Sequence, residues 1–177
     1  MSASLKLIEK HGVEGFTMAD IATSTGLSRP AIYQYFASKE HILGELLIDD
    51  MADLSNEIDR IVASVEDPME QIRLWMHYSL AHLASHDHLV VREISMTHLR
   101  NEHRGELRAM HGLFLTTLHS PLMRLGIEDP TSLGSMIFGA VNSAAQRIYS
   151  GKSFVFEAST LEKFVIAGIE AASSSQR

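Results

Sequence analysis

Residues 25–40 read TGLSRPAIYQYFASKE, and this stretch decides how the N-terminal part of the chain folds. Gly26 stops the helix before it and takes the turn. Ser28 is typical of a helix N-terminus, because its hydroxyl can accept a hydrogen bond from the first helical turn, and Pro30 is tolerated in that turn. Ser38 repeats the same signal. The stretch therefore predicts a tight turn, a short helix, and the start of another helix directly after it.

A second short helix is predicted before the turn. Thr17 is followed three residues later by Asp20, which is the spacing of a helix N-cap with a reciprocal acceptor. Ile21, Leu27 and Ile32 are spaced so that the two helices can share a small core. Two short helices joined by a glycine turn predict a helix-turn-helix, whose second helix enters the major groove of DNA. The alternative interpretation is that the same geometry serves only as scaffolding.

Small and polar residues in and around the second helix are the candidates for DNA contacts: Thr17, Ser28, Arg29, Pro30, Ala31, Tyr33, Gln34, Tyr35 and Lys39. A guanidinium at the helix start suits a phosphate or a guanine edge, and the amide of Gln34 suits an adenine edge. The two tyrosine hydroxyls and the lysine ammonium can reach backbone phosphates. Proline and alanine can touch thymine methyl groups.

The run over residues 17–43, T-M-A-D-I-A-x-x-x-G-L-S-R-P-A-I-Y-x-Y-F-x-S-K-E-x-I-L, resembles the DNA-binding signature of TetR-family transcriptional regulators. The family's Y-x-[YH]-F-x-[SN]-K-[ED] element is present as residues 33–40. The resemblance implies a three-helix DNA-binding domain over residues 1–45 and a helical effector-binding and dimerisation domain over residues 46–177. It also implies a homodimer that represses transcription at a double-stranded operator until a small organic effector binds.

The whole chain predicts an all-α fold, because apolar residues recur at spacings of three and four and strand-like alternation is almost absent. Its 177 residues are 45% hydrophobic and 21% charged, which is typical of a globular protein long enough to bury a core. Expected helices cover about residues 3–11, 17–25, 28–35, 38–65, 69–86, 87–99, 104–125, 131–150 and 157–172.

Charge and motif content exclude several classes of function. The net charge is −7, but residues 1–45 hold four Lys or Arg against five Asp or Glu, so the acid lies mainly outside the DNA-binding segment. The chain has no cysteine, which excludes thiolate catalysis and cysteine-ligated zinc. No phosphate loop, dinucleotide glycine pattern or nucleophile elbow occurs, so we expect neither an enzyme nor a cofactor. Without an export signal or a membrane span, we expect a cytoplasmic protein.

Two sets of C-terminal residues are candidates for binding. An effector pocket is predicted from aromatic, methionine and histidine side chains on successive helices, namely Trp75, Tyr78, His82, Met96, Met110, Phe114 and Met136. A dimer interface is predicted from the wide apolar stripes of the last two helices, with Val141, Ala144, Ala145, Ile148, Phe164 and Ile169 as its residues. In both cases the alternative is that these side chains form the internal core.

Histidines are frequent, with ten in the chain and eight of them between residues 77 and 119. His82 and His86 have the i, i+4 spacing of two metal ligands on one helix, and Glu93 or His98 would complete such a site. Histidines in a cluster can also sense pH. The alternative function is therefore a helical metal- or pH-sensing binding protein; the structural alternative is that these histidines are solvated.

Overall fold

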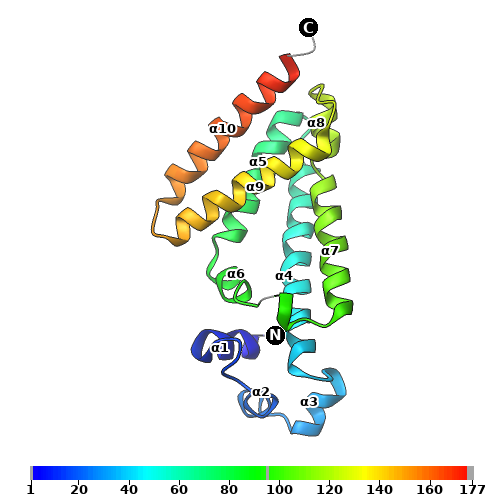
Figure 1. Ribbon diagram of the computed structural model, residues 1–177, viewed down its shortest axis with the longest axis vertical. Helices are drawn as coiled ribbons and strands as arrows, with labels where there is room; N and C mark the ends of the chain where they lie inside the picture. The colour runs from blue at the N-terminus through cyan, green and yellow to red at the C-terminus, as the bar shows by residue number, and fades with distance from the viewer. Residues whose placement is uncertain (1, 95, 175–177) are drawn as a thin grey trace. The chain divides into compact units, whose positions relative to one another are not determined.

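The computed structural model describes residues 2–94 and 96–174, and every regular element within them is a helix (Figure 1). This confirms the all-α fold. The chain divides into two packing units, each made of two segments: an N-terminal unit with residues up to 52 and 86–110, and a C-terminal unit with residues 53–85 and those from 111 onward. No helix in the described ranges has an apolar stretch long enough to cross a membrane.

Two long helices, α4 (Lys39–Val62) and α7 (Asn101–Thr116), begin in the N-terminal unit and end in the C-terminal unit. The N-terminal unit also contains α1 (Ser2–His11), α2 (Met18–Thr25), α3 (Arg29–Tyr35), α6 (His86–Val91) and the 3₁₀ helix η1 (Met96–His98). The C-terminal unit contains α5 (Pro68–Leu83), α8 (His119–Arg124), α9 (Pro130–Tyr149) and α10 (Phe154–Ser174).

The helix ends of the N-terminal unit follow the predicted caps. The backbone N–H of Thr17 donates to Asp20 Oδ2 at 2.7 Å, and the backbone N–H of Asp20 donates to Thr17 Oγ1 at 3.4 Å, so α2 begins with a complete capping box. Gly26 has φ = 71°, which places the turn after α2 in the left-handed region. Ser28 Oγ accepts a hydrogen bond from the backbone N–H of Ala31 at 3.3 Å and caps α3.

Replacing Thr17 by alanine is expected to lower the free energy of unfolding by about 1 kcal/mol, because the first turn of α2 loses its cap. Hydrogen bonds from Thr17 hold the pKa of Asp20 below its ordinary value. Such a carboxylate stabilises the fold above its unfolded pKa, and the effect is lost as the pH falls through the lower folded pKa. Urea titrations should therefore show a difference between the two proteins at pH 7 that narrows below about pH 4. Thr23→Ala is the control, because the Thr23 hydroxyl donates to the Ala19 carbonyl and caps no helix. An equal loss of unfolding free energy in both variants would contradict the capping argument.

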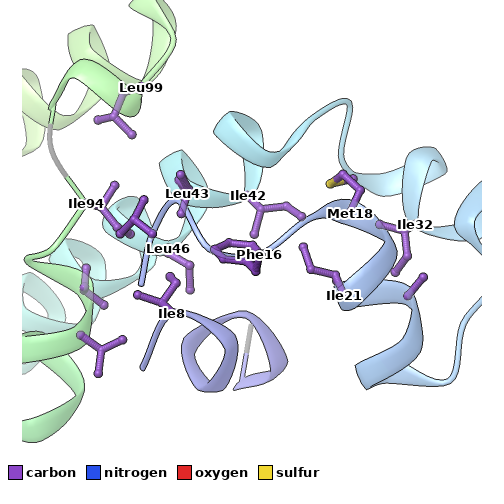
Figure 2. Close-up of a cluster of buried hydrophobic side chains, with 14 residues drawn as sticks. Ile8, Phe16, Met18, Ile21, Ile32, Ile42, Leu43, Leu46, Ile94 and Leu99 are labelled. Atoms are coloured by element: carbon purple, nitrogen blue, oxygen red, sulfur yellow. The ribbon is translucent and has the colours of Figure 1, made fainter. Parts of the chain in front are cut away.

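Buried apolar side chains from both segments of the N-terminal unit form one core (Figure 2). Figure 2 shows Phe16, Ile8 and Ile42 gathered in this core. Ile94 and Leu99 belong to the same cluster, which explains why residues 86–110 group with the N-terminal segment and why this unit extends past residue 45. The prediction that Leu27 belongs to the core was wrong: it lies in the turn and is 49% exposed.

The C-terminal unit is built around α5, which packs against α8, α9 and α10. In Figure 1, α9 and α10 run side by side in opposite directions after the turn that joins them. Trp75 of α5 has no exposed surface, and Val141 of α9 and Ile169 of α10 are also buried.

Two predicted helices are interrupted in the structure. The helix expected over residues 87–99 is divided into α6 and η1, and the helix expected over 104–125 is divided into α7 and α8. Between α7 and α8, Leu118 N–H bonds to the carbonyl of Leu115 rather than to the residue four back, so the coil tightens there. Pro121 has no N–H to continue the pattern of α7 and lies instead in the first turn of α8, where none is needed.

Candidate nucleic-acid interface

Helix α3 buries one side chain, half-buries another and leaves the other five exposed. Ile32 is the one buried residue among the seven of α3, all of which the structure describes. Arg29, Pro30, Tyr33, Gln34 and Tyr35 are exposed, and Tyr35 has 72% of its surface accessible. An aromatic residue at that exposure gains little from burial, so these side chains are available to an external partner. Such an arrangement suits a helix that reads DNA.

Some predicted contact residues also have a structural task. The Ser28 oxygen accepts the bond that caps α3, and the Thr17 oxygen belongs to the capping box of α2, where its hydroxyl donates to Asp20 Oδ2 at 2.7 Å. Ala31 is half-buried. The caps explain why hydroxyl residues occur at Thr17 and Ser28 without reference to a ligand, and DNA contact by these three residues stays a prediction.

Lys39 is held by contacts inside the N-terminal unit. Its ammonium lies 4.7 Å from the centroid of the Phe16 ring and 3.8 Å from a carboxylate oxygen of Glu14. The Lys39 side chain is only 18% exposed. A phosphate contact by Lys39 therefore has to compete with a cation–π contact and a surface ion pair, which makes Lys39 a weaker candidate than Arg29.

The end of α3 is tied to the first turn of α4 through His41. The Ala37 backbone N–H donates to His41 Nδ1 at 3.2 Å, and the His41 backbone N–H donates to Ser38 Oγ at 3.3 Å. The edge of the His41 ring also faces the Phe36 ring, with centroids 5.8 Å apart. Sequence reasoning identified the Ser38 cap and missed His41; the signal was a hydrogen-bonding side chain three residues after a helix cap.

In the C-terminal unit, two of the predicted pocket residues meet. The rings of Trp75 and Phe114 stack with centroids 4.8 Å apart, and Trp75 Nε1 donates to Thr117 Oγ1 at 2.8 Å. Two residues that sequence reasoning missed join them: the Phe138 ring packs at about right angles to both, and the centroid of the His111 ring lies 4.8 Å from that of Phe138. These four rings, from Trp75, His111, Phe114 and Phe138, are called the aromatic cluster below.

Burial lowers the pKa of His111, because the charged imidazolium would lose hydration. The imidazole is therefore neutral near pH 7 and offers one N–H donor and one acceptor beside an otherwise apolar set of rings. Folding favours the neutral form, so the contribution of His111 to stability is lost as the pH falls below about 6.5.

The other predicted pocket residues have different positions. Tyr78 and His82 are half-buried on α5. Met136 is 68% exposed and lines the surface between α9 and α10 rather than the aromatic cluster. Met96 and Met110 belong to the N-terminal unit, Met96 exposed and Met110 half-buried.

Helices α9 and α10 divide the predicted interface residues into two groups. Val141, Ala144, Ala145 and Ile169 are buried within the single chain, so these side chains pack in its own core and have little surface for a partner. Ile148 is half-buried, whereas Phe164 is 69% exposed. An open apolar groove of about 530 Å³ lies between the two helices, lined among others by Met136, Ser143, Thr160, Leu161 and Phe164.

The predicted metal ligands His82 and His86 do not share a helix. Helix α5 ends at Leu83, and His86 begins α6, so the i, i+4 argument does not apply. His86 Nε2 lies 3.1 Å from Glu9 Oε1, and His98 Nε2 lies 2.9 Å from Glu14 Oε1. These two histidines therefore face different carboxylates.

Comparison with known proteins finds a family match for the N-terminal part of the chain. Residues 1–46 match the family described as bacterial regulatory proteins, tetR family. The HTH-type transcriptional regulator BetI of Agrobacterium fabrum is 30% identical over 79 residues, which are 45% of this chain and 38% of BetI. The nucleoid occlusion factor SlmA of Vibrio campbellii is 32% identical over 82 residues, 46% of this chain and 42% of SlmA. The match thus spans less than half the length of these curated relatives.

Solved structures extend the likeness to the fold of nearly the whole chain. The TetR family transcriptional regulator PfmR from Thermus thermophilus has a TM-score of 0.73 at 21% identity, with 92% of each chain covered. The transcriptional regulator FadR from Bacillus subtilis, solved in complex with stearoyl-CoA, has a TM-score of 0.77 at 20% identity, covering 94% of this chain and 96% of FadR.

Proposed function

We propose that this chain, which carries at residues 1–46 the N-terminal domain of the tetR family of bacterial regulatory proteins, is an effector-responsive repressor that binds operator DNA as a homodimer. The observation that carries the proposal is helix α3, which buries Ile32 and leaves a guanidinium, an amide and two phenols exposed. Among the described residues of the N-terminal unit, no internal contact requires that combination of side chains. DNA offers a partner for each of them.

Variants of α3 test the DNA contacts. We expect Tyr33→Ala to weaken binding to all DNA sequences, and Gln34→Ala to relax the preference at one base position. The logarithm of the DNA-binding constant falls linearly with the logarithm of the salt concentration. If Arg29 contacts a phosphate, Arg29→Ala should make this slope shallower by about 0.9 for each phosphate that is no longer neutralised. Fluorescence anisotropy on operator DNA selected from a random pool measures all three.

Lys152→Ala is the charge-matched control for Arg29→Ala, because Lys152 is exposed in the turn between α9 and α10 and its loss changes the net charge equally. It should leave the salt dependence unchanged. If the α3 variants bind DNA as tightly as the unmodified chain, α3 is not the DNA-reading helix.

A second copy of the chain is the proposed partner of the α9–α10 groove. One recognition helix reads only a few base pairs, so a palindromic operator needs two chains related by a two-fold axis. Met136 and Phe164 supply exposed apolar surface, while Ala167 and Gly168 are small and exposed and allow close helix approach. Exposed aromatic and methionine side chains of this kind are enriched at the centres of protein interfaces.

The aromatic cluster is the proposed place for the effector. Trp75 and Phe114 are buried, whereas Phe138 and His111 are half-buried, so an effector would meet the Phe138 ring and the neutral hydrogen-bonding group of His111 first. Because α4 takes part in both packing units, it is the natural element through which effector binding would change the DNA-binding unit. An effector weakens operator binding by its preference for the conformation that binds DNA poorly. A thermal-shift screen should include acyl-CoA thioesters, since FadR from Bacillus subtilis holds stearoyl-CoA.

A further inference from the structure

We propose that His41, Glu45 and His103 form a binding site for one divalent transition-metal ion, such as Zn²⁺, inside the N-terminal unit. All three belong to this unit, two on α4 and one in the first turn of α7. The inference goes beyond DNA and effector binding and depends on neither. It also differs from the site expected from His82 and His86.

The spacing of the donor atoms fits a metal. His41 Nε2 lies 3.4 Å from Glu45 Oε1, and His103 Nε2 lies 3.3 Å from the same oxygen. With metal–ligand bonds of about 2.0–2.2 Å, neighbouring donors of a tetrahedral site lie about 3.3–3.6 Å apart. A donor atom from each of the three residues lies within 4.8 Å of the others. The donors are thus close enough to share one ion after small side-chain rotations.

The chemistry of the donors also fits. Imidazole nitrogen and carboxylate oxygen are ligands that Zn²⁺ takes, and three protein ligands leave a fourth position for water. His41 and Glu45 are one helical turn apart on α4, so they project from the same face of that helix. The His41 and His103 ring centroids are 5.4 Å apart, with the carboxylate of Glu45 within reach of both rings.

The fold makes room for His103 at a position where a larger residue would block it. His103 is 5% exposed, and a Cβ added at Gly44 would overlap its ring at Nδ1. The ring therefore rests on α4 only because residue 44 has no side chain. Its Nδ1 is buried without a hydrogen-bond partner among the described residues. That nitrogen lies against Gly44, so the ring presents its other nitrogen, Nε2, to Glu45 and to the proposed ion.

Metal binding would change a hydrogen bond next to the end of α3. His41 Nδ1 accepts the Ala37 N–H, so the neutral ring carries its proton on Nε2, facing Glu45. Coordination of the neutral ring through Nε2 requires its other tautomer, in which the proton has moved from Nε2 to Nδ1 by exchange with water, so Nδ1 can then no longer accept from Ala37. The ion and the Ala37 hydrogen bond therefore exclude one another. Ala37 lies two residues beyond the end of α3.

Isothermal titration of the full chain with Zn²⁺ at pH 7.5 tests the site. We expect one ion per chain, with affinity lowered at least tenfold in His41→Gln and in His103→Gln. His86→Gln is the matched control, because that exposed histidine also faces a carboxylate, Glu9, and its loss should leave the affinity unchanged. Co²⁺ should give the absorption spectrum of a tetrahedral ion. Equal affinity in His103→Gln and the unmodified chain would overturn the proposal.

Gly44→Ala tests whether the position of the His103 ring matters when no ligand is removed. It keeps all three ligands and displaces only the His103 ring. We expect it also to bind Zn²⁺ at least tenfold more weakly, with circular dichroism confirming that the variant is folded. In ¹⁵N-resolved spectra, the Ala37 amide resonance should shift as Zn²⁺ is added to the unmodified chain. Full Zn²⁺ binding by Gly44→Ala would show that the ion is held by other residues, and an unmoved Ala37 resonance would exclude coordination by His41 Nε2.

Discussion

Replacing Trp75 by alanine is expected to lower the free energy of unfolding by about 3–5 kcal/mol, the range for a large aromatic side chain removed from a core. Trp75 has no exposed surface, stacks on Phe114 and packs at about a right angle to the Phe138 ring. Its removal leaves a cavity among the helices of the C-terminal unit and also leaves Thr117 without the indole donor. The loss is large because the rigid rings around the cavity can collapse only in part.

Urea unfolding followed by circular dichroism measures this effect. Leu113→Ala is the matched surface truncation, since Leu113 is exposed and lies on α7 next to buried Phe114, and it should change the free energy of unfolding by no more than about 0.5 kcal/mol. Thr117→Val removes the acceptor of the indole hydrogen bond, together with the hydroxyl's own bond to the Phe114 carbonyl, and should cost about 1–3 kcal/mol. A Trp75→Ala loss as small as that of Leu113→Ala would mean that the aromatic cluster is not the core of this unit.

Replacing Phe164 by glutamate is expected to make the protein monomeric and to weaken operator binding about 100-fold or more. The charge would lie on an exposed apolar face of α10, where a two-fold interface would take it out of water. A monomer holds one recognition helix, so binding to the operator loses the gain in affinity of about 10²–10⁴-fold that two linked DNA-binding domains provide.

Sedimentation velocity and fluorescence anisotropy give the two readouts. Leu113→Glu is the control, because Leu113 is equally exposed but lies on α7, outside the α9–α10 groove. Circular dichroism should show unchanged helix content in both variants. A dimeric Phe164→Glu protein would place the interface elsewhere, whereas a monomeric protein with full operator affinity would contradict the need for two chains.

The sequence alone was sufficient for the features that depend on neighbours within one helical turn. The caps at Thr17, Ser28 and Ser38, the turn at Gly26 and the inward Ile32 were all predicted. Each is a contact between residues three or four apart, or a property of one residue's backbone. The all-α fold follows from the same short-range periodicity.

Predictions that depend on which side of a helix packs against a neighbour were correct only in part. The apolar stripe of α9 is wide, and only packing shows that Val141 faces the core while Met136 is exposed. Leu27 fits the apolar spacing, yet the turn leaves it exposed. Trp75 and Phe114 were singled out, but Phe138 and His111 join them only because α9 and the second half of α7 pack beside α5.

The histidines show most clearly the difference between what local sequence predicts and what tertiary packing decides. In the sequence, the close spacing of His82 and His86 predicts a metal site. In the structure a helix ends between them, so they share no helix face. His41 and His103 lie far apart in the chain, and their rings meet only because α7 begins against the first turns of α4, where Gly44 leaves space. Local hydrogen bonding and periodicity are encoded in short segments, whereas contacts between distant side chains exist only once the helices have packed.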